Sequence, residues 1–314
     1  MVLVVHIEGK SVETALNWLE LTNCLQEGHL YSQPQLEDNL LVQGSNRLLN
    51  RLAWIEGLGS AVKTCTIYPD NAKNGIPTIN GMMTIFSNDN GKPEAIIDFH
   101  LVTKWKTAAD SLLAASLLAP HNPHKYLVIG AGIVARSLVE AYMARFPEME
   151  IMVWNRTRSR AMELIEDYKD FCVISHAEDL PKAAEMSDII SCATMSQEPV
   201  LKGDWISPRT HIDLIGAFTP EMREADDKIL QIGDLFVDYR RTTIGHIGEL
   251  TIPMANGILS ENDVVADFYD IQAGRFARKS DESVTVFKNG GGAHLDLMTG
   301  KYIYQKWQQS QDQA

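Results

Sequence analysis

The sequence predicts an α/β protein in which a doubly wound parallel sheet is joined to a mixed α+β domain. From Lys125 onward, short and continuously apolar segments recur, and helical stretches lie between several of them. This alternation is typical of parallel strands that are buried on both faces and connected by helices. The part before Lys125 shows no such repeat. The predicted parallel strands are residues 126–129, 151–154, 172–174, 189–193, 212–215 and 235–237.

The first 119 residues predict a mixed sheet with helices around it. Apolar residues recur with helical spacing over 11–26, which indicates a helix. A second helix is predicted at 107–119, an alanine- and leucine-rich run that Pro120 ends. Turn-forming sequences separate the β-like segments between these helices, which are 61–68, 77–86 and 94–98. We therefore expect a domain boundary at 119/120.

Composition and charge exclude several classes of function. The 314 residues are 45% hydrophobic and 22% charged, which is ordinary for a globular protein. A net charge of −13 without a basic stripe argues against nucleic-acid binding, and no apolar run is long enough to cross a membrane. The cysteines form no CxxC pair and are Cys24, Cys65, Cys172 and Cys192. We expect reduced cysteines, no metal site and a cytoplasmic location, since the N-terminus lacks the features of a signal peptide.

A glycine-rich loop follows the predicted strand at 126–129. Gly130 permits a tight turn, Gly132 lets the backbone approach a pyrophosphate, and Ala135 lets the next helix lie close to the strand. That helix is predicted at 136–145, and the free N–H groups at its N-terminus would bind the phosphates. Because a strand precedes the loop and a helix follows it, we interpret the loop as a Rossmann-type dinucleotide site and not as an ordinary glycine turn.

The end of the strand at 151–154 bears on the choice of cofactor. An NAD site usually carries a carboxylate there, which accepts hydrogen bonds from the ribose hydroxyls. This chain has Asn155 instead, followed by Arg156, Thr157 and Arg158. The neutral amide does not repel a 2′-phosphate, and both arginines can form charge-assisted bonds with it. The sequence therefore favours NADP(H), with NAD(H) as the alternative if the arginines are only solvated loop residues.

Four further segments occur together with the glycine-rich loop. They are Val62-Lys63 with Pro69-x-Asn71 and Gly75-x-Pro77-Thr78; Thr103-Lys104-Trp105-Lys106-Thr107-Ala108-Ala109; Ile215-Gly216-Ala217-Phe218-Thr219-Pro220 with Glu224 and Val237-Asp238; and Thr285-Val286-Phe287-Lys288 with Gly290-Gly291. In this combination the chain resembles the ornithine cyclodeaminase/μ-crystallin family, from about Ala53 onward. The resemblance implies a dimeric NAD(P)-dependent enzyme acting on amino acids and cyclic imines, although one member is better known as a binding protein.

The resemblance also implies a division into two domains. A substrate and dimerisation domain would comprise 1–119 and be joined by the C-terminal segment 296–314, and a Rossmann dinucleotide-binding domain would comprise 120–295. From the residues themselves, the polar tail at 305–314 is expected to fray.

Site residues follow from the resemblance one at a time. Lys63 matches the lysine that contacts the substrate, and Thr78 matches a substrate-binding threonine. Lys106 falls on the family's arginine, so a substrate carboxylate would be held without the bidentate fork that arginine offers. Arg51 is not part of a family motif; from its place ahead of the turn at 54–57 alone, it is expected to help hold that carboxylate. Ser196 follows the predicted strand at 189–193 and is expected to lie near the nicotinamide ribose.

One family position departs from the pattern in a way that limits the chemistry. Cyclodeaminases carry an aspartate where this chain has Phe218, and a phenyl ring can neither accept a proton nor hydrogen-bond an amine. Asp213, upstream in the same predicted strand, is a weak substitute because of the alternation of side chains along the strand. Cyclisation of ornithine with loss of ammonia is therefore disfavoured. His294 could contact the substrate or could be a packing residue.

The resulting hypothesis is an oxidoreductase that reduces a small imine acid with NADPH. Δ1-Pyrroline-2-carboxylate or its six-membered homologue would be the substrate, and Lys63 would supply positive charge or a proton. Four different functions share most of these motifs. They are those of an ornithine cyclodeaminase, an open-chain amino-acid dehydrogenase, an iminosuccinate-type reductase and an NADPH-dependent binding protein of the μ-crystallin type.

Overall fold

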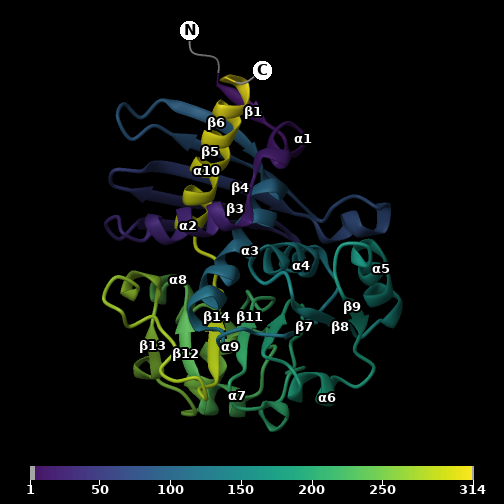
Figure 1. Ribbon diagram of the computed structural model, residues 1–314. Helices are drawn as coiled ribbons and strands as arrows, with labels where there is room; N and C mark the ends of the chain where they lie inside the picture. Colours follow the sequence, from purple (N-terminus) through teal and green to yellow (C-terminus); the bar gives the residue numbers. More distant parts are fainter. Residues whose placement is uncertain (1–3, 313–314) are drawn as a thin grey trace. The chain divides into compact units, whose positions relative to one another are not determined.

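The computed structural model describes residues 4–312, which form two compact units (Figure 1). The N-terminal unit combines residues 4–106 with 292–312, and the central unit comprises residues 107–291. The first division between the units falls inside a helix, before the predicted boundary at 119/120. The assignment of separate functions to two domains stays a prediction.

The N-terminal unit contains a six-stranded mixed sheet with the order β1-β6-β5-β4-β3-β2. β1 pairs with β6 in parallel, and the other neighbours are antiparallel. The strands are β1 (Val5–Ile7), β2 (Gln35–Gln43), β3 (Asn46–Ile55), β4 (Gly59–Ile67), β5 (Ile79–Phe86) and β6 (Pro93–Asp98). β4, β5 and β6 confirm the predicted strands, whereas β1, β2 and β3 were not predicted.

One face of this sheet is covered by α10 (Ala293–Asp312), which packs over β3, β4 and β5 and against α2 (Trp18–Gly28) (Figure 1). The two helices meet closely at Gly28, where a Cβ would lie 2.5 Å from the sulfur of Met298. Side chains alternate along a strand, so Ala61, Lys63 and Cys65 of β4 share the buried face. The alternation therefore places the charged Lys63 inside the unit.

Two predictions for this unit are wrong in their details. Residues 11–26 do not form one helix: α1 (Gly9–Val12) and a short 3-10 turn end before Asn17, whose side chain accepts hydrogen bonds from the N–H groups of Leu19 and Glu20 and begins α2. The tail does not fray over 305–312, because α10 continues to Asp312 and Lys306 forms a 2.6 Å ion pair with Glu20. Residues 313–314 lie outside the described part of the chain.

The central unit contains an eight-stranded sheet in which every neighbouring pair is parallel. Its order is β13-β12-β14-β11-β10-β7-β8-β9. The strands are β7 (Lys125–Ile129), β8 (Glu150–Trp154), β9 (Ile174–His176), β10 (Ile189–Cys192), β11 (His211–Leu214), β12 (Asp234–Val237), β13 (Val264–Ala266) and β14 (Thr285–Lys288). All six predicted strands are present, although β9 begins only at the end of its predicted range, and β13 and β14 are additional.

Helices connect these strands, as the alternating pattern predicted. They are α3 (Phe99–Leu118), which begins earlier than the predicted helix at 107–119, α4 (Ile133–Arg145), α5 (Arg158–Tyr168), α6 (Leu180–Glu185), α7 (Asp227–Ile232), α8 (Arg240–Thr243) and α9 (Gly248–Ala255). The central strands of the sheet, β10, β11 and β14, are completely buried and form the core of the unit, whereas β9 at the edge is partly exposed. The chain is thus an α/β protein with a doubly wound parallel sheet and a mixed sheet. The loops that follow β7, β10, β11 and β14 leave the same edge of the parallel sheet, where ligands of such folds bind.

Candidate active site and dinucleotide-binding loop

The loop after β7 has the geometry that a dinucleotide requires. Gly130 has a φ of 123°, and a Cβ at this position would lie 2.5 Å from the carbonyl oxygen of Ala193. Gly132 is the residue before α4, and a Cβ there would meet nothing within 4 Å. Ala135 is fully buried against the sheet. The backbone is therefore open to a phosphate at Gly132, and the first N–H groups of α4 have no partner within the helix.

The loop after β8 lies beside this glycine loop, since the N–H of Gly130 donates to the carbonyl of Trp154 at 2.8 Å. Asn155 does not reach out of the loop, because its amide donates to the carbonyl of Thr157 at 2.8 Å. Arg158 forms a 2.7 Å ion pair with Glu178.

Arg156 differs from Arg158. Its side chain is exposed and forms no hydrogen bond or ion pair with any residue between 4 and 312. Of the two arginines that the sequence analysis assigned to a 2′-phosphate, Arg156 is the one whose charge is available.

Ser196 shapes the loop after β10. Its hydroxyl donates to the carbonyl of Glu198 at 2.6 Å, and its own carbonyl accepts the N–H of Arg223. Contact with a nicotinamide ribose stays a prediction for this residue.

A buried cluster of cations lies in the N-terminal unit, between the sheet and α10. Lys63 of β4 forms a 2.8 Å ion pair with Asp296 of α10, and both side chains are almost fully buried. Its ammonium group lies 4.6 Å from the centre of the Phe99 ring. Arg51 of β3 is directly opposite Lys63 in the strand register and forms a 3.1 Å ion pair with Asp38.

Lys106 of α3 completes this cluster, and its side chain is the one that the described residues leave without a counter-ion. The residue is only 6% exposed, yet its ammonium group forms no hydrogen bond or ion pair within residues 4–312. Burial of a charge is costly unless it is paired. The charge of Lys106 is therefore available to an anionic ligand.

The charges in the cluster act on one another. Burial would raise the pKa of Asp296, but the charges of Lys63, Lys106 and Arg51 hold it below its usual value of 3.8. Burial lowers the pKa of Lys63 below 10.5, and the charge of Asp296 opposes this shift. The positive charges of Lys63, Lys106 and Arg51 thus gather around Asp296, and such surroundings suit a carboxylate ligand.

Thr78 lies just ahead of β5 and is half-buried. Its carbonyl accepts the N–H of Tyr68 at 2.8 Å, and within the described chain it makes no hydrogen bond to the cations of the cluster. In the sheet, Lys63 is paired with Met83, which lies five residues after Thr78 in the sequence. The structure does not bring Thr78 into the cluster, and its contact with a substrate stays a prediction.

Sequence reasoning missed one member of the cluster and left the role of a neighbouring histidine open. Asp296 was not identified, and His294 was left between a ligand and a packing role. His294 is fully buried, and its ring packs edge-on against that of His29 at 5.5 Å between centroids. Burial lowers the pKa of His29 to about 4, and burial together with nearby positive charge lowers the pKa of His294 well below 6.5. Both imidazoles are therefore neutral near pH 7. The sequence signal for this group was the spacing His294-x-Asp296 after a glycine-rich segment.

Asp213 does not replace the missing acid at position 218. Phe218 is 56% exposed in the loop after β11. Asp213 is fully buried in the middle of the sheet, where it accepts hydrogen bonds from the side chains of Tyr142, Ser191 and His211. This carboxylate belongs to the core and faces no ligand site.

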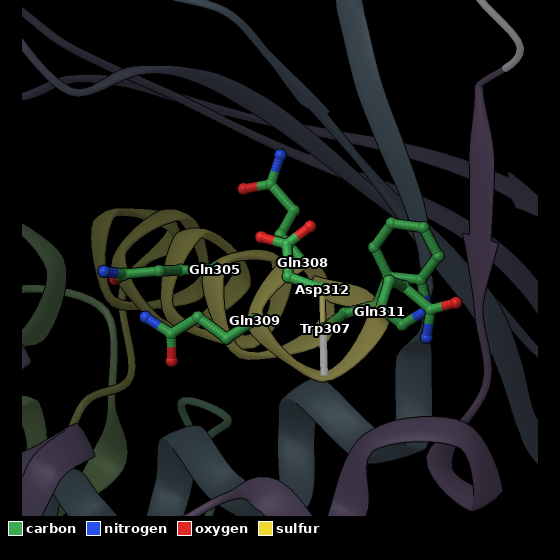
Figure 2. Close-up of a pocket in the computed structure, with 6 residues that line it drawn as sticks. All are labelled: Gln305, Trp307, Gln308, Gln309, Gln311 and Asp312. Atoms are coloured by element: carbon green, nitrogen blue, oxygen red, sulfur yellow. The ribbon is translucent and has the colours of Figure 1, made fainter. Parts of the chain in front are cut away.

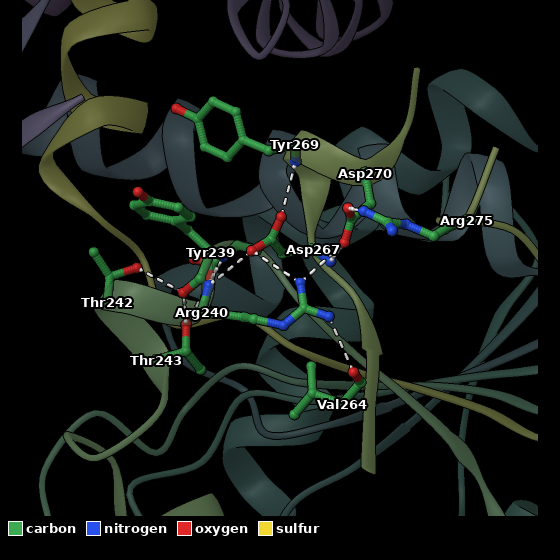
Figure 3. Close-up of polar contacts among 10 residues, drawn as sticks. Tyr239, Arg240, Thr242, Thr243, Val264, Asp267, Tyr269, Asp270 and Arg275 are labelled. Atoms are coloured by element: carbon green, nitrogen blue, oxygen red, sulfur yellow. Dashed lines mark hydrogen bonds and ion pairs between the residues drawn. The ribbon is translucent and has the colours of Figure 1, made fainter. Parts of the chain in front are cut away.

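Polar contacts fix the loop after β12 (Figure 3). Arg240 donates to Asp270 at 2.9 Å and to the carbonyl of Val264 at 3.0 Å, and it forms an ion pair with Asp267. The aspartate of the Val237-Asp238 motif is buried. Its carboxylate accepts the N–H groups of Gly290 and Gly291 after β14. The motif therefore ties the ends of β12 and β14 together.

Other features carry no candidate site. Figure 2 shows a shallow hollow at the end of α10, and its lining residues are Gln305, Trp307, Gln308, Gln309, Gln311 and Asp312. This hollow contains no cation and no nucleophile.

In residues 4–312, no cluster of histidine, cysteine, aspartate and glutamate has the arrangement of a metal site. No helix in the same range combines the length and the apolar character needed to cross a bilayer.

Comparison with known proteins identifies relatives of the chain. Residues 33–311 match the family model described as the ornithine cyclodeaminase/mu-crystallin family. A Δ1-pyrroline-2-carboxylate reductase from Paracoccus denitrificans is 47% identical over 291 residues, covering 92% of each chain. The structure of Thermococcus litoralis Δ1-pyrroline-2-carboxylate reductase in complex with NADH and L-proline superposes with a TM-score of 0.90 at 26% identity and covers 98% of both chains. An archaeal alanine dehydrogenase dimer with bound NAD superposes with a TM-score of 0.89 at 26% identity, covering 98% of this chain and 97% of the other.

Proposed function

Since the chain belongs to the ornithine cyclodeaminase/mu-crystallin family, we propose that it is an NAD(P)H-dependent reductase of a small cyclic imine acid. The substrate is Δ1-pyrroline-2-carboxylate or its six-membered homologue, and the product is the cyclic amino acid. The observation that carries this proposal is the buried cation cluster, in which Lys106 has no counter-ion within residues 4–312 beside the Lys63–Asp296 pair. The identity of 47% to a reductase of this kind supports the same substrate class.

In this proposal the cluster divides the work of binding and proton transfer. Lys106 and Arg51 hold the substrate carboxylate. Thr78, which lies outside the cluster, is proposed to orient the ligand from the start of β5. Lys63 gives a proton to the imine nitrogen, because a protonated imine is a better hydride acceptor. Burial suits Lys63 to this role, since a lowered pKa makes its ammonium group a stronger acid than that of an exposed lysine. Asp296 keeps the lysine oriented and favours its charged form.

The residues of the glycine loop fit a dinucleotide, since Gly132 leaves open space beside the N-terminus of α4. When bound, NAD(P)H supplies a hydride to the imine carbon. The chain's own contribution is to bind the phosphates at Gly130, Gly132 and the first turn of α4, and to fix the loop at Ser196.

The site argues against a cyclodeaminase. Such an enzyme needs an acid at the position of Phe218, and the candidate substitute, Asp213, is occupied by three side-chain donors. An open-chain dehydrogenase, an iminosuccinate-type reductase and a binding protein would all keep the same pocket. These three functions are therefore distinguished from cyclic-imine reduction by measuring which substrates, if any, the protein turns over.

Purified protein is expected to oxidise NADPH rapidly with Δ1-pyrroline-2-carboxylate or Δ1-piperideine-2-carboxylate. The same assay includes iminosuccinate and pyruvate with ammonia, and ornithine is tested separately for release of ammonia. Turnover of iminosuccinate alone, or of pyruvate with ammonia alone, would replace the cyclic imine by an open-chain substrate. Ammonia from ornithine would contradict the argument from Phe218, and tight NADPH binding without turnover would indicate a binding protein.

The preference for NADP(H) is a further part of the proposal, and Arg156 supports it. Arg156→Ala is expected to raise the KM for NADPH by roughly tenfold, since hydrogen bonds to a charged group contribute about 1.5–3 kcal/mol. The KM for NADH should not change, because NADH lacks the 2′-phosphate. Arg158→Ala is the matched control and should have a smaller effect, since Glu178 already pairs with Arg158. An equal rise of the KM for NADPH and for NADH in the Arg156 variant would contradict this assignment.

We also propose that two copies of the chain associate. β2 is an edge strand, and it exposes three consecutive apolar side chains, Leu40, Leu41 and Val42. Such an edge is a template for pairing with another chain. The archaeal alanine dehydrogenase of similar structure is a dimer. Light scattering should therefore give twice the chain mass of 35.0 kDa, and a monomer would contradict the proposal.

A cytoplasmic location stays part of the proposal and is supported by four cysteines that form no disulfide.

A further inference from the structure

A buried carboxylate lies under the loops at the carboxyl edge of the parallel sheet. Glu224 is completely buried. One oxygen accepts the N–H and the hydroxyl of Thr194, at 2.7 and 2.8 Å. The other accepts the N–H groups of Gly216 and Ala217, at 2.6 and 3.3 Å. A single side chain thus fixes the residues that follow β10 and those that follow β11.

These two loops are next to the dinucleotide loop. In the sheet, β10 lies between β7 and β11. The residue before Thr194, Ala193, touches Gly130 so closely that a Cβ on the glycine would lie 2.5 Å from the alanine carbonyl. Gly216 is equally confined, since its Cβ would lie 1.8 Å from the carbonyl of Thr194. The shape of the cofactor side of the sheet therefore depends on the contacts that Glu224 makes.

Two further buried charges support Glu224. Glu249 of α9 accepts the N–H groups of Glu224 and Ala225, at 2.7 and 3.1 Å. Lys288, the last residue of β14, is fully buried and donates to the carbonyls of Leu214 and Asn289. The end of β14 is thereby linked to the end of β11.

Glu224 titrates in the range in which the protein would be assayed. Burial raises its pKa, Lys288 and the Thr194 contacts lower it, and the charge of Glu249 raises it, so that the net pKa is about 7. The charge of Glu224 also contributes to raising the pKa of Cys192 in β10, after the larger effect of burial. The supporting charges have neighbours of their own, which are Arg223 near Glu249, and Asp238 and Asp110 near Lys288. When Glu224 takes up a proton, its carboxyl group is a weaker acceptor for the four donors.

We infer that Glu224 is a positioning residue, which in its ionised form holds the loops after β10 and β11 in the conformation that binds the nicotinamide half of the dinucleotide. The inference rests on the proposed cofactor binding. It implies that the affinity for the cofactor falls as the pH is lowered through 7, although Glu224 itself contacts no ligand.

The test measures the dissociation constant of NADH between pH 6 and 8.5 with the full chain. NADH is the probe because it lacks the 2′-phosphate, which titrates at a pH of about 6. For the wild type, the dissociation constant is expected to be about tenfold higher at pH 6 than at pH 8, because only about a tenth of the molecules are ionised at the lower pH. Glu224→Gln should bind NADH about tenfold more weakly at pH 8 and should show no dependence on pH in this range.

Two variants serve as controls. Glu221→Gln makes the same change at an exposed position three residues earlier and should behave as the wild type. Thr194→Val removes one donor and keeps the charge, so it should weaken binding while leaving the pH dependence in place. If Glu224→Gln does not fold, the wild type and Thr194→Val still decide the question. A residue of merely structural importance would lower the Tm without changing the pH dependence of binding.

The possible failures can be told apart. A wild-type dissociation constant that is flat between pH 6 and 8 would overturn the role of Glu224 and leave the reductase in place. No binding of NADH or NADPH by the wild type at any pH would contradict the proposed function, and the inference would fall with it.

Discussion

Replacing Lys63 by methionine is expected to lower kcat for imine reduction by roughly 10²- to 10⁴-fold, the range over which a positioned general acid acts. The affinity for NADPH should change little, because Lys63 is not part of the glycine loop proposed to bind the phosphates. In the wild type, kcat should fall as the pH rises through the pKa of the lysine, since the ammonium form is the proton donor. Burial places that pKa below 10.5. The variant should lose this limb of the pH profile.

A loss of stability must be separated from a loss of chemistry in this experiment. Lys63→Met leaves the carboxylate of Asp296 buried without its partner, which costs about 3–5 kcal/mol. Combining Lys63→Met with Asp296→Asn removes both charges, so the Tm should recover while kcat stays low. Recovery of kcat along with the Tm, or a kcat close to that of the wild type in the single variant, would rule out Lys63 as the proton donor.

The parts of the fold that the sequence predicts well are those whose determinants are local. The glycine loop at Gly130 and Gly132 was found because the required φ and the open approach depend on residues within one turn of chain. The parallel strands were found because burial on both faces leaves continuous apolar runs. β2 escaped prediction because Leu40, Leu41 and Val42 are apolar but exposed, so no alternation marks a buried face.

The candidate site is predicted only in part, because its members meet across the fold. Lys63 and Asp296 are 233 positions apart in the sequence, and no local pattern connects them. The His29–His294 contact joins the end of α2 to the start of α10 in the same way. Family resemblance supplied Lys63 and Lys106, since each lies in a motif of its own, whereas Arg51 was chosen from its place ahead of the turn at 54–57. The buried carboxylate that pairs with Lys63, Asp296, could be identified only from the structure, in which α10 packs on the sheet.

Replacing Lys106 by methionine is expected to weaken substrate binding and to leave the rate of the chemical step unchanged. Truncating one member of a buried charge pair costs about 2–5 kcal/mol, and about 1.4 kcal/mol is tenfold in affinity. The KM for the cyclic imine acid should therefore rise by roughly 30-fold or more, while kcat at saturation and the KM for NADPH stay close to the wild type. Because Lys106 has no counter-ion within residues 4–312, its removal leaves no partner unpaired, and the Tm should not fall.

Lys106→Arg is the informative control, because it keeps the charge and restores the family's arginine. Arginine binds a carboxylate through two parallel N–H groups, whereas lysine acts as a point charge. If Lys106 holds the substrate carboxylate, the arginine variant should retain a KM near or below that of the wild type, far from that of the methionine variant. An equal rise of the KM in both variants would mean that substrate binding depends on the shape of the side chain at this position and not on its charge. A methionine variant with an unchanged KM would contradict the assignment of the substrate carboxylate to Lys106.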